Sequence, residues 1–328
     1  MAVTIKDIAK KLNISYATVS RALRDSPEIS QDTKEKVKKA AKEMNYQPNA
    51  IARGLVTKKT KTIGLILPDI TNPFYPQVAR GVEETANQEG YSVFLCNSNY
   101  ENEKEKAYID LLISKKVDGI ILAPIGEESL KWNHREIPIV IIGRKNVCPQ
   151  ENFVVIDDKK GGYLATEHLI KNGHSKIMFI GGKEKVESNK ERLEGYKLAL
   201  NKNGIQLDAN LIRNDHFKRE SGHILMKKAL QEGIAATAVF AGNDLLALGV
   251  LQAIYEYGLK VPQDIAVVGF DNIPTAELPE ISLTTIAQPK YKMGVLATQM
   301  LLVKIKNPTH RCESIILTPE LIVRKTSI

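Results

Sequence analysis

The chain has 328 residues, of which 43% are hydrophobic and 26% charged, and its formal net charge is +8. This composition is typical of a soluble protein of two or three domains and excludes a chain that is disordered throughout. The apolar runs are too short to cross a bilayer and the first residues lack the apolar core of a signal peptide, so we expect a cytoplasmic protein with no membrane partner. The cysteines Cys96, Cys148 and Cys312 stand apart and predict neither disulfides nor a metal site.

The excess positive charge lies at one end of the chain. Residues 1–61 hold fourteen Lys and Arg against six Asp and Glu; since the whole chain holds 46 and 38, the remainder has 32 of each. A basic segment joined to a neutral body is typical of a nucleic-acid-binding head, although a solvated basic tail would give the same charge. The pattern within the segment must decide between these two interpretations.

Three short helices are predicted in this basic segment. Thr4 can cap the first, which runs to Leu12, Ser15 can cap the second, Tyr16–Leu23, and the third covers about Gln31–Met44. Two short helices joined by about four residues form a helix-turn-helix, whose second helix enters the major groove of DNA. The residues that would face the bases are Tyr16, Ala17, Thr18, Ser20 and Arg21, and the Arg can donate two hydrogen bonds to guanine. A helical bundle that binds no DNA is the alternative.

Strands and helices alternate from residue 62 onward. The predicted strands are Thr62–Pro68, Ser92–Asn97, Gly119–Ala123, Ile139–Gly143 and Val154–Ile156, then Lys176–Gly181, Ala238–Ala241, Ile265–Gly269 and Leu283–Ala287, and finally Ile315–Val323. The predicted helices are Tyr75–Glu89, Lys104–Lys115, Lys159–Asn172, Lys190–Asn203, Ser221–Glu232, Leu245–Tyr257 and Pro289–Lys306. Two such series predict two doubly wound parallel-sheet lobes, with a ligand in the cleft between them.

Motifs of enzymes are missing from the sequence. There is no GxGxxG, GxxxxGK[ST], GxSxG or HExxH, so we expect no catalytic residues, no metal site and no cofactor. We interpret Gly161-Gly162 and Gly181-Gly182 as turn and helix-start glycines rather than phosphate cradles. Asp157-Asp158 and Asn243-Asp244 are interpreted as helix caps or as groups that bind a ligand by hydrogen bonds.

Several segments are specific enough to indicate a family. They are TIKDIA, ATVSRAL, NYQPNAIARGL and TKTIGLILPDITNPFY near the start, then RLEGY, FAGNDLLALGVLQAI and LTTIAQP. Together they resemble the lactose/galactose-repressor (LacI/GalR) family over essentially the whole chain, and the body also resembles periplasmic sugar-binding proteins of type I. The resemblance implies a helix-turn-helix domain at 1–47, a hinge helix and linker at 48–61, and a ligand-binding and dimerisation domain at 62–328.

The resemblance also implies details of each domain. The N-lobe would comprise about 62–158 and 290–319 and the C-lobe about 159–288 and 320–328, with crossings near Asp157–Gly162, Gln288–Lys290 and Pro319–Leu321. Residues 49–56 would fold into the hinge helix on DNA, with Leu55 wedged into the minor groove; a plain linker is the alternative. The other residues implied at the DNA are Thr4, Tyr46, Asn49 and Ala52.

Ten cleft residues are likewise implied to bind a ligand. Phe74, Tyr75 and Phe217 would stack on a sugar ring, with core packing as the alternative. The hydrogen-bonding residues would be Asn72, Arg144, Ser188, Arg192, Asn243, Asp271 and Gln288, although Arg192 and Asp271 could instead form a structural salt bridge. Gly143 replaces an acidic residue of ribose-binding proteins, which argues against free ribose in particular.

The sequence thus predicts a homodimeric DNA-binding regulator, a repressor of carbohydrate genes whose partners are operator DNA and a sugar-like effector. The alternatives are a purine- or nucleoside-responsive member, a catabolite-control member that binds a phosphorylated carrier protein, and a sugar-binding or sugar-processing protein with an unrelated basic head. Gln299 replaces an arginine used by the catabolite-control branch. No heptad pattern follows the last strand, so we expect a dimer rather than a tetramer, formed through the first helix of the N-lobe and the helix after Asn243.

Overall fold

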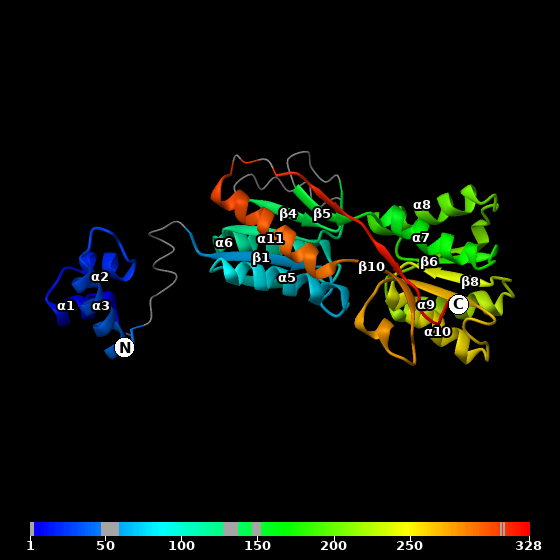
Figure 1. The fold of residues 1–328 in the computed structure, drawn as a ribbon, viewed down its shortest axis with the longest axis horizontal. Coiled ribbons are helices and arrows are strands. Elements are labelled where there is room, and N and C mark those ends of the chain that lie inside the picture. Colours follow the sequence, from blue (N-terminus) through cyan, green and yellow to red (C-terminus); the bar gives the residue numbers. More distant parts are fainter. Residues whose placement is uncertain (1–2, 47–58, 127–136, 146–151, 309, 311) are drawn as a thin grey trace. The chain divides into compact units, whose positions relative to one another are not determined.

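The computed structural model describes residues 3–46, 59–126, 137–145, 152–308, 310 and 312–328. They belong to two compact units, Met1–Thr60 and Lys61–Ile328 (Figure 1). The segment expected to form the hinge helix, with Asn49, Ala52 and Leu55, lies outside the described residues, as does Cys148.

The described part of the first unit is a bundle of short helices: α1 (Ile5–Leu12), α2 (Tyr16–Leu23) and α3 (Gln31–Glu43). Their apolar faces meet in one core around the fully buried Ile8, Val19 and Val37. Thr4 begins α1, where its backbone N–H and its hydroxyl both donate to the Asp7 carboxylate at 2.8 and 2.7 Å. The carboxylate of Asp7, in the first turn of the helix, thus provides the hydrogen-bond acceptor for groups at the start of that helix. The predicted helix-turn-helix head is therefore confirmed.

The second unit contains two sheets, each of six described strands. The first sheet has the order β11-β5-β4-β3-β1-β2, with all strand pairs parallel. Its strands are β1 (Thr62–Leu67), β2 (Ser92–Asn97), β3 (Gly119–Leu122), β4 (Ile139–Ile142), β5 (Asn152–Ile156) and β11 (Ile315–Leu317). The second sheet has the order β12-β10-β9-β8-β6-β7, and only β12 runs antiparallel to its neighbour. Its strands are β6 (Ile177–Gly181), β7 (Ile212–Asn214), β8 (Ala238–Ala241), β9 (Ala266–Asp271), β10 (Thr284–Ala287) and β12 (Glu320–Ile322).

Helices cover both faces of each sheet, which confirms two doubly wound α/β lobes (Figure 1). The first lobe has α5 (Phe74–Gln88), α6 (Asn102–Ser114) and α11 (Lys290–Lys306). The second lobe has α7 (Asp158–Lys171), α8 (Glu187–Lys202), α9 (Arg219–Gln231), α10 (Asp244–Glu256) and the short 3-10 helices η2 (Ala209–Leu211) and η3 (Pro274–Glu277). Inner strands such as β1 and β6 are apolar almost throughout because both of their faces are buried.

The described chain passes between the two sheets at three places. These lie between β5 and α7, between β10 and α11, and between β11 and β12. The prediction of a single strand over Ile315–Val323 is wrong, because β11 joins the first sheet and β12 the second. Pro319 lies between them, and proline has no N–H with which to continue a ladder. The edge strand β7 was not predicted at all; its three residues carry too short a pattern.

Glycines hold three pairs of helices unusually close together. The pairs are α5 with α11, α7 with α8, and α9 with α10, and each helix contributes one glycine at the contact. A Cβ atom on any of these glycines would overlap a backbone oxygen of the facing helix. The six positions are Gly81 and Gly294, Gly162 and Gly195, and Gly222 and Gly249. Each helix pair therefore depends on two residues that lack a side chain.

We expect Gly249→Ala to lower the free energy of unfolding by about 1–3 kcal/mol, as overpacked sites do. The added methyl would meet the Arg219 carbonyl, which is backbone and cannot swing away. Gly126→Ala is the matched control, because its Cβ would meet only a flexible side-chain atom of Asn102 at 3.5 Å. Urea unfolding of both variants measures the difference, and equal midpoints would show that the helices separate without cost.

Candidate functional site

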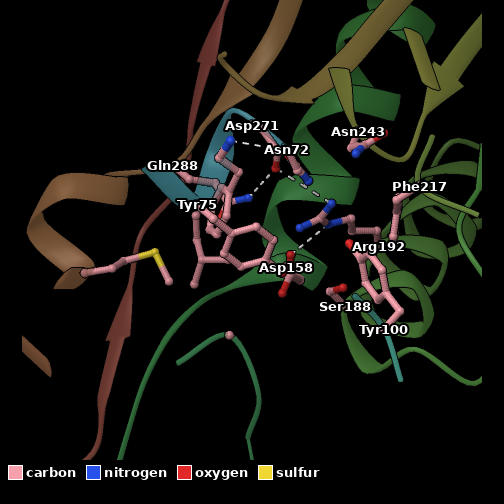
Figure 2. A pocket seen from close by; sticks show the side chains of 14 residues that line it. Asn72, Tyr75, Tyr100, Asp158, Ser188, Arg192, Phe217, Asn243, Asp271 and Gln288 are labelled. Atoms are coloured by element: carbon pink, nitrogen blue, oxygen red, sulfur yellow. Dashed lines mark hydrogen bonds and ion pairs between the residues drawn. The ribbon is translucent and has the colours of Figure 1, made fainter. Parts of the chain in front are cut away.

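A pocket lies between the two lobes, at the carboxyl ends of the parallel strands (Figure 2). This is the edge of a parallel sheet where ligands bind in open α/β folds. From the first lobe it is lined by Asn72, Phe74, Tyr75, Tyr100, Gly143, Ile156 and Met293. From the second lobe and the crossing segments it is lined by Asp158, Ser188, Arg192, Phe217, Asn243, Asp271 and Gln288.

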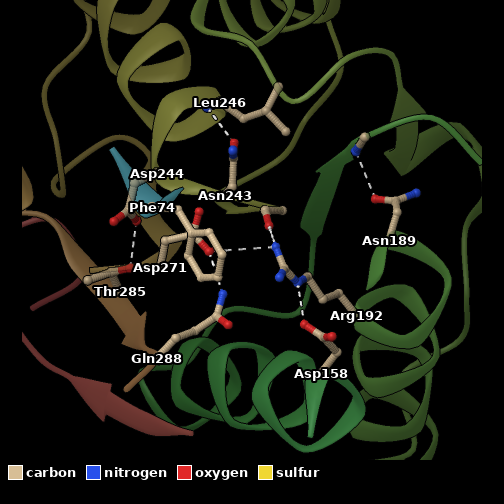
Figure 3. A network of polar contacts seen from close by, with 12 residues as sticks. Phe74, Asp158, Asn189, Arg192, Asn243, Asp244, Leu246, Asp271, Thr285 and Gln288 are labelled. Atoms are coloured by element: carbon tan, nitrogen blue, oxygen red, sulfur yellow. Dashed lines mark hydrogen bonds and ion pairs between the residues drawn. The ribbon is translucent and has the colours of Figure 1, made fainter. Parts of the chain in front are cut away.

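A buried arginine organises the second-lobe wall of the pocket. Nε of Arg192 donates to Oδ1 of Asp158 at 2.8 Å, and Nη1 donates to the Gly242 carbonyl at 2.6 Å. Nη1 also lies 3.9 Å from Oδ1 of Asp271 (Figure 3). The guanidinium stacks on the Phe270 ring, with its carbon 3.7 Å from the ring centroid. Contacts on several sides thus fix the plane of this arginine before any ligand arrives.

Asp271 stands between this arginine and the second crossing. It is the last residue of β9, and Nε2 of Gln288 donates to its Oδ1 at 2.6 Å (Figure 3). Burial raises the pKa of Asp271 to about 6, although Arg192 and Lys290 oppose this shift. Burial also raises the pKa of Asp158, against the opposing charge of Arg192. Both carboxyl groups are buried, and each accepts a hydrogen bond from a neighbouring side chain.

A third carboxyl group lies behind the pocket. Asp244 accepts hydrogen bonds from the Thr285 hydroxyl at 2.6 Å and from the Ile273 N–H at 2.8 Å. Burial, together with the neighbouring charge of Asp271, raises the pKa of Asp244 to about 8. This group ties the start of α10 to β10 and to the loop after β9, so its role is structural.

Two asparagines present donors to the pocket. Oδ1 of Asn243 caps α10 by accepting from the Leu246 N–H at 2.9 Å, and Oδ1 of Asn72 accepts from the Phe74 N–H at 3.0 Å. Because each carbonyl oxygen is occupied in this way, the side-chain NH2 group is the part that can serve a ligand. The prediction that Asn243 is a helix cap is confirmed.

Aromatic rings form the rest of the lining. Phe74 and Tyr75 meet edge to face, with centroids 5.0 Å apart, and Phe217 lies on the second-lobe side (Figure 2). Tyr100 enters from the turn after β2, where Asn99 and Tyr100 have φ values of 54° and 58°. Burial raises the pKa of the Tyr75 hydroxyl, so it is a neutral donor.

Nine of the ten side chains predicted for the cleft line this pocket, and Arg144 does not. Arg144 is buried beside Gly143, whose φ of 78° turns the chain so that the glycine reaches the pocket instead. Sequence reasoning missed Tyr100, Ile156 and Met293 as lining residues and left Asp158 as either a helix cap or a ligand-binding group. Only Asp158 gave a signal, because the pair Asp157-Asp158 follows a strand; Asp157 caps α7 through the Lys160 N–H at 2.9 Å.

The residues predicted to face DNA lie on and around α2 in the first unit. Tyr16 is 61% exposed, Ala17 and Arg21 are exposed, and Thr18 and Ser20 are half-buried. Arg21 pairs with Glu28 at 3.0 Å, and both side chains are more than half exposed. Two other residues have structural contacts: Thr4 is bound to Asp7, and Tyr46 packs against the helical core.

Comparison with known proteins places both units in one family. The family described as "Bacterial regulatory proteins, lacI family" matches residues 4–49. The family described as "Periplasmic binding proteins and sugar binding domain of LacI family" matches residues 60–325. The chain belongs to the LacI family. It is therefore a DNA-binding transcriptional regulator, as the sequence predicted.

Individual relatives of this LacI-family chain are similar over nearly their whole length. The HTH-type transcriptional repressor PurR of Vibrio atlanticus (strain LGP32) is 38% identical, covering 98% of each chain. The lac repressor dimer bound to operator and the anti-inducer ONPF has a TM-score of 0.90 at 29% identity, covering 100% of each chain. A LacI-family regulator from Enterococcus faecium with bound ribose has a TM-score of 0.74 at 31% identity, covering 81% of this chain and 98% of that one.

These relatives are regulators rather than enzymes. In the part of the chain that the structure describes, none of the helices is long and apolar enough to cross a membrane.

Proposed function

We propose that this regulator represses transcription from an operator and that a small, neutral, polyhydroxylated ligand controls it from the cleft. The observation that carries the proposal is the charge of the pocket. Of the described side chains that line it, Arg192 is cationic, whereas Asp158 and Asp271 are anionic when ionised. The arginine already donates to one of these carboxylates and lies near the other. The pocket therefore has little positive charge to offer a phosphate group.

The remaining groups suit a sugar. Carboxylates accept hydrogen bonds from hydroxyls, the NH2 groups of Asn72 and Asn243 donate to them, and aromatic rings can cover the apolar faces of a sugar ring. The ribose in the Enterococcus faecium relative supports a ligand of this class. A purine or nucleoside is the second candidate, because the rings of Phe74 and Phe217 line the pocket and could stack on a base.

Thermal denaturation of the full chain tests this proposal. We expect neutral pentoses or hexoses at saturating concentration to raise the melting temperature by several degrees, because a ligand at about 100 times its Kd adds about 2.7 kcal/mol. The phosphate esters of the same sugars should have no effect, since they would meet Asp158 and Asp271. Stabilisation by a phosphate ester alone would contradict the proposed ligand class, and stabilisation by purines alone would favour the second candidate.

Control of DNA binding by the ligand requires that ligand binding in the second unit changes DNA binding by the first unit. In this proposal the head residues Tyr16, Ala17, Thr18, Ser20 and Arg21 read the operator. Thr4, Tyr46, Asn49, Ala52 and Leu55 complete the contact with DNA. Ligand binding would change the orientation of the lobes and so decide whether two heads can pair on one site. The lac repressor dimer bound to operator supports this arrangement. A regulator that binds operator DNA would act in the cytoplasm, which is the compartment that we propose.

We propose a dimer, because one helix-turn-helix reads only half of a two-fold symmetric operator. Large apolar side chains are exposed where a second copy could cover them. On the edge strand β2, Phe94 is 53% and Leu95 48% exposed, and Tyr255 on α10 is 52% exposed. The edge strand β2 thus joins α5 and α10, the two helices expected from the sequence, as a candidate for the interface.

Light scattering at micromolar concentration should give a mass near twice 36.5 kDa. Leu95→Glu should shift that mass toward one chain, because a buried charge without a partner opposes association. A mass near four chains would contradict the dimer. An unchanged mass for the variant would show that β2 is not part of the interface.

A further inference from the structure

A buried lysine links the two lobes beside the pocket. Lys290 is the first residue of α11, a helix that packs against α5 and the first sheet, and it is only 9% exposed. Its Nζ donates to the main-chain carbonyl of Asp271 and, at 2.8 Å, to that of Asn272. The first carbonyl ends β9 and the second begins the loop that follows β9 in the second lobe. A first-lobe helix therefore holds a second-lobe loop through one ammonium group.

The loop that Lys290 holds has an uncommon backbone conformation. Asp271 has a φ of 112° and Asn272 a φ of 50°, a region that side-chain-bearing residues seldom adopt. Two such residues in succession persist only where the surroundings fix them. Other contacts come from the second lobe and its terminal segment: Asp244 accepts from the Ile273 N–H, and Arg324 donates to Oδ1 of Asn272 at 2.9 Å. Lys290 supplies a contact from the first lobe.

The second crossing contacts Asp271 twice. Gln288 donates to its carboxylate, and Lys290, two residues later, donates to its carbonyl. Both side chains come from the short segment that joins β10 to α11. Any rotation of the first lobe moves the start of α11 and must change one or both of these contacts, or carry Asp271 along.

We infer that Lys290 is a positioning residue, which fixes the direction in which Asp271 presents its carboxylate to the ligand and couples that direction to the orientation of the first lobe. This inference rests on the proposed function of the cleft. The ammonium donates to two carbonyl oxygens rather than to a carboxylate, so its role is to orient the backbone and not merely to neutralise the nearby Asp244, Asp271 and Glu277.

Hydrogen exchange of the full chain tests the positioning without a ligand. Lys290→Met keeps the length and apolar character of the side chain and removes its donors. We expect amides in residues 272–278 to exchange roughly tenfold faster or more, since hydrogen bonds to charged groups are lost. Amides within β9 should be unchanged. Lys292→Met, on the exposed side of the same helix, is the control, and Lys290→Arg should restore much of the protection. Unchanged exchange in Lys290→Met would overturn the positioning role.

Operator binding tests the coupling. The probe is a millimolar mixture of D-ribose, D-xylose, D-glucose and D-galactose, added to the full chain on an operator selected from random duplexes. Lys290→Met should bind the operator like the wild type without sugar and lose most of the sugar-induced change in affinity. A full response would overturn the coupling. If the wild type itself fails to respond, the proposed ligand class is wrong, whereas the exchange experiment still decides on Lys290.

Discussion

Asp271→Asn is expected to lower ligand affinity roughly 10- to 100-fold and to leave operator binding without ligand unchanged. In the proposed complex the carboxylate accepts hydrogen bonds from ligand hydroxyls, and bonds to a charged group contribute about 1.5–3 kcal/mol each. Asparagine preserves the shape and one acceptor oxygen but not the charge. The basal operator complex should persist because the head is a separate compact unit of the chain. Calorimetric titration with a sugar that stabilises the wild type measures the loss.

The pH dependence of the same titration identifies the group. The pKa of Asp271 is raised to about 6, and ligand hydroxyls favour the ionised form, so wild-type affinity should decline as the pH falls through that value. The asparagine variant should lose this decline, although Asp158 and Asp244 remain.

Folding provides the control. A raised carboxyl pKa means that ionisation of Asp271 opposes folding as pH rises, so the variant should melt no lower than the wild type at neutral pH. Wild-type affinity and pH profile in the variant would instead make Asp271 a structural partner of Arg192.

Arg192 shows that one polar side chain can both line a ligand pocket and form a structural salt bridge. From the sequence, it was either a ligand donor or half of a salt bridge. In the structure it lines the pocket and also pairs with Asp158, 34 residues away in the chain. Helical spacing shows which face of α8 a residue occupies, but not which strand end that face meets. Arg192→Ala would therefore leave buried carboxylates without their partner and is the less informative variant.

The fold was predictable where apolar strands and amphipathic helices alternate, because each local pattern agrees with the layered architecture. The prediction from the local pattern failed at residues 315–323, whose apolar character continues across Pro319. The two halves are separated by their partners: Ile315 pairs with Val154, and Ile322 pairs with Thr285. These partners lie far away in the chain, so no local pattern indicates that the two halves join different sheets.

Backbone turns accompany two of the errors in the site. Tyr100 reaches the pocket because two successive residues adopt positive φ, which nothing in an Asn-Tyr pair requires. Gly143 has positive φ and takes the place that Arg144 was expected to occupy. In both cases the residue lies in a turn after a strand, and strand periodicity does not extend past that turn.

In the head, Arg21→Ala is expected to weaken binding to the selected operator by about 1–3 kcal/mol for each half-site. In a dimer this loss of binding free energy occurs at both half-sites. Arg21 is exposed on α2, and its ion pair with Glu28 at 3.0 Å joins two solvated side chains. Such a pair contributes little, so DNA can replace the glutamate without a large penalty. Glu28→Ala should therefore bind the operator at least as well as the wild type.

The salt dependence of binding decides whether Arg21 reads a base or contacts a phosphate. If it donates two hydrogen bonds to guanine, Arg21→Ala should weaken operator binding far more than binding to a scrambled duplex and leave the slope of log K against log salt nearly unchanged. Arg21→Lys keeps the charge without the planar fork and should restore only part of the discrimination. An equal loss on both duplexes, with a slope smaller by about one, would place Arg21 on the phosphate backbone, because each neutralised phosphate contributes about −0.9 to that slope.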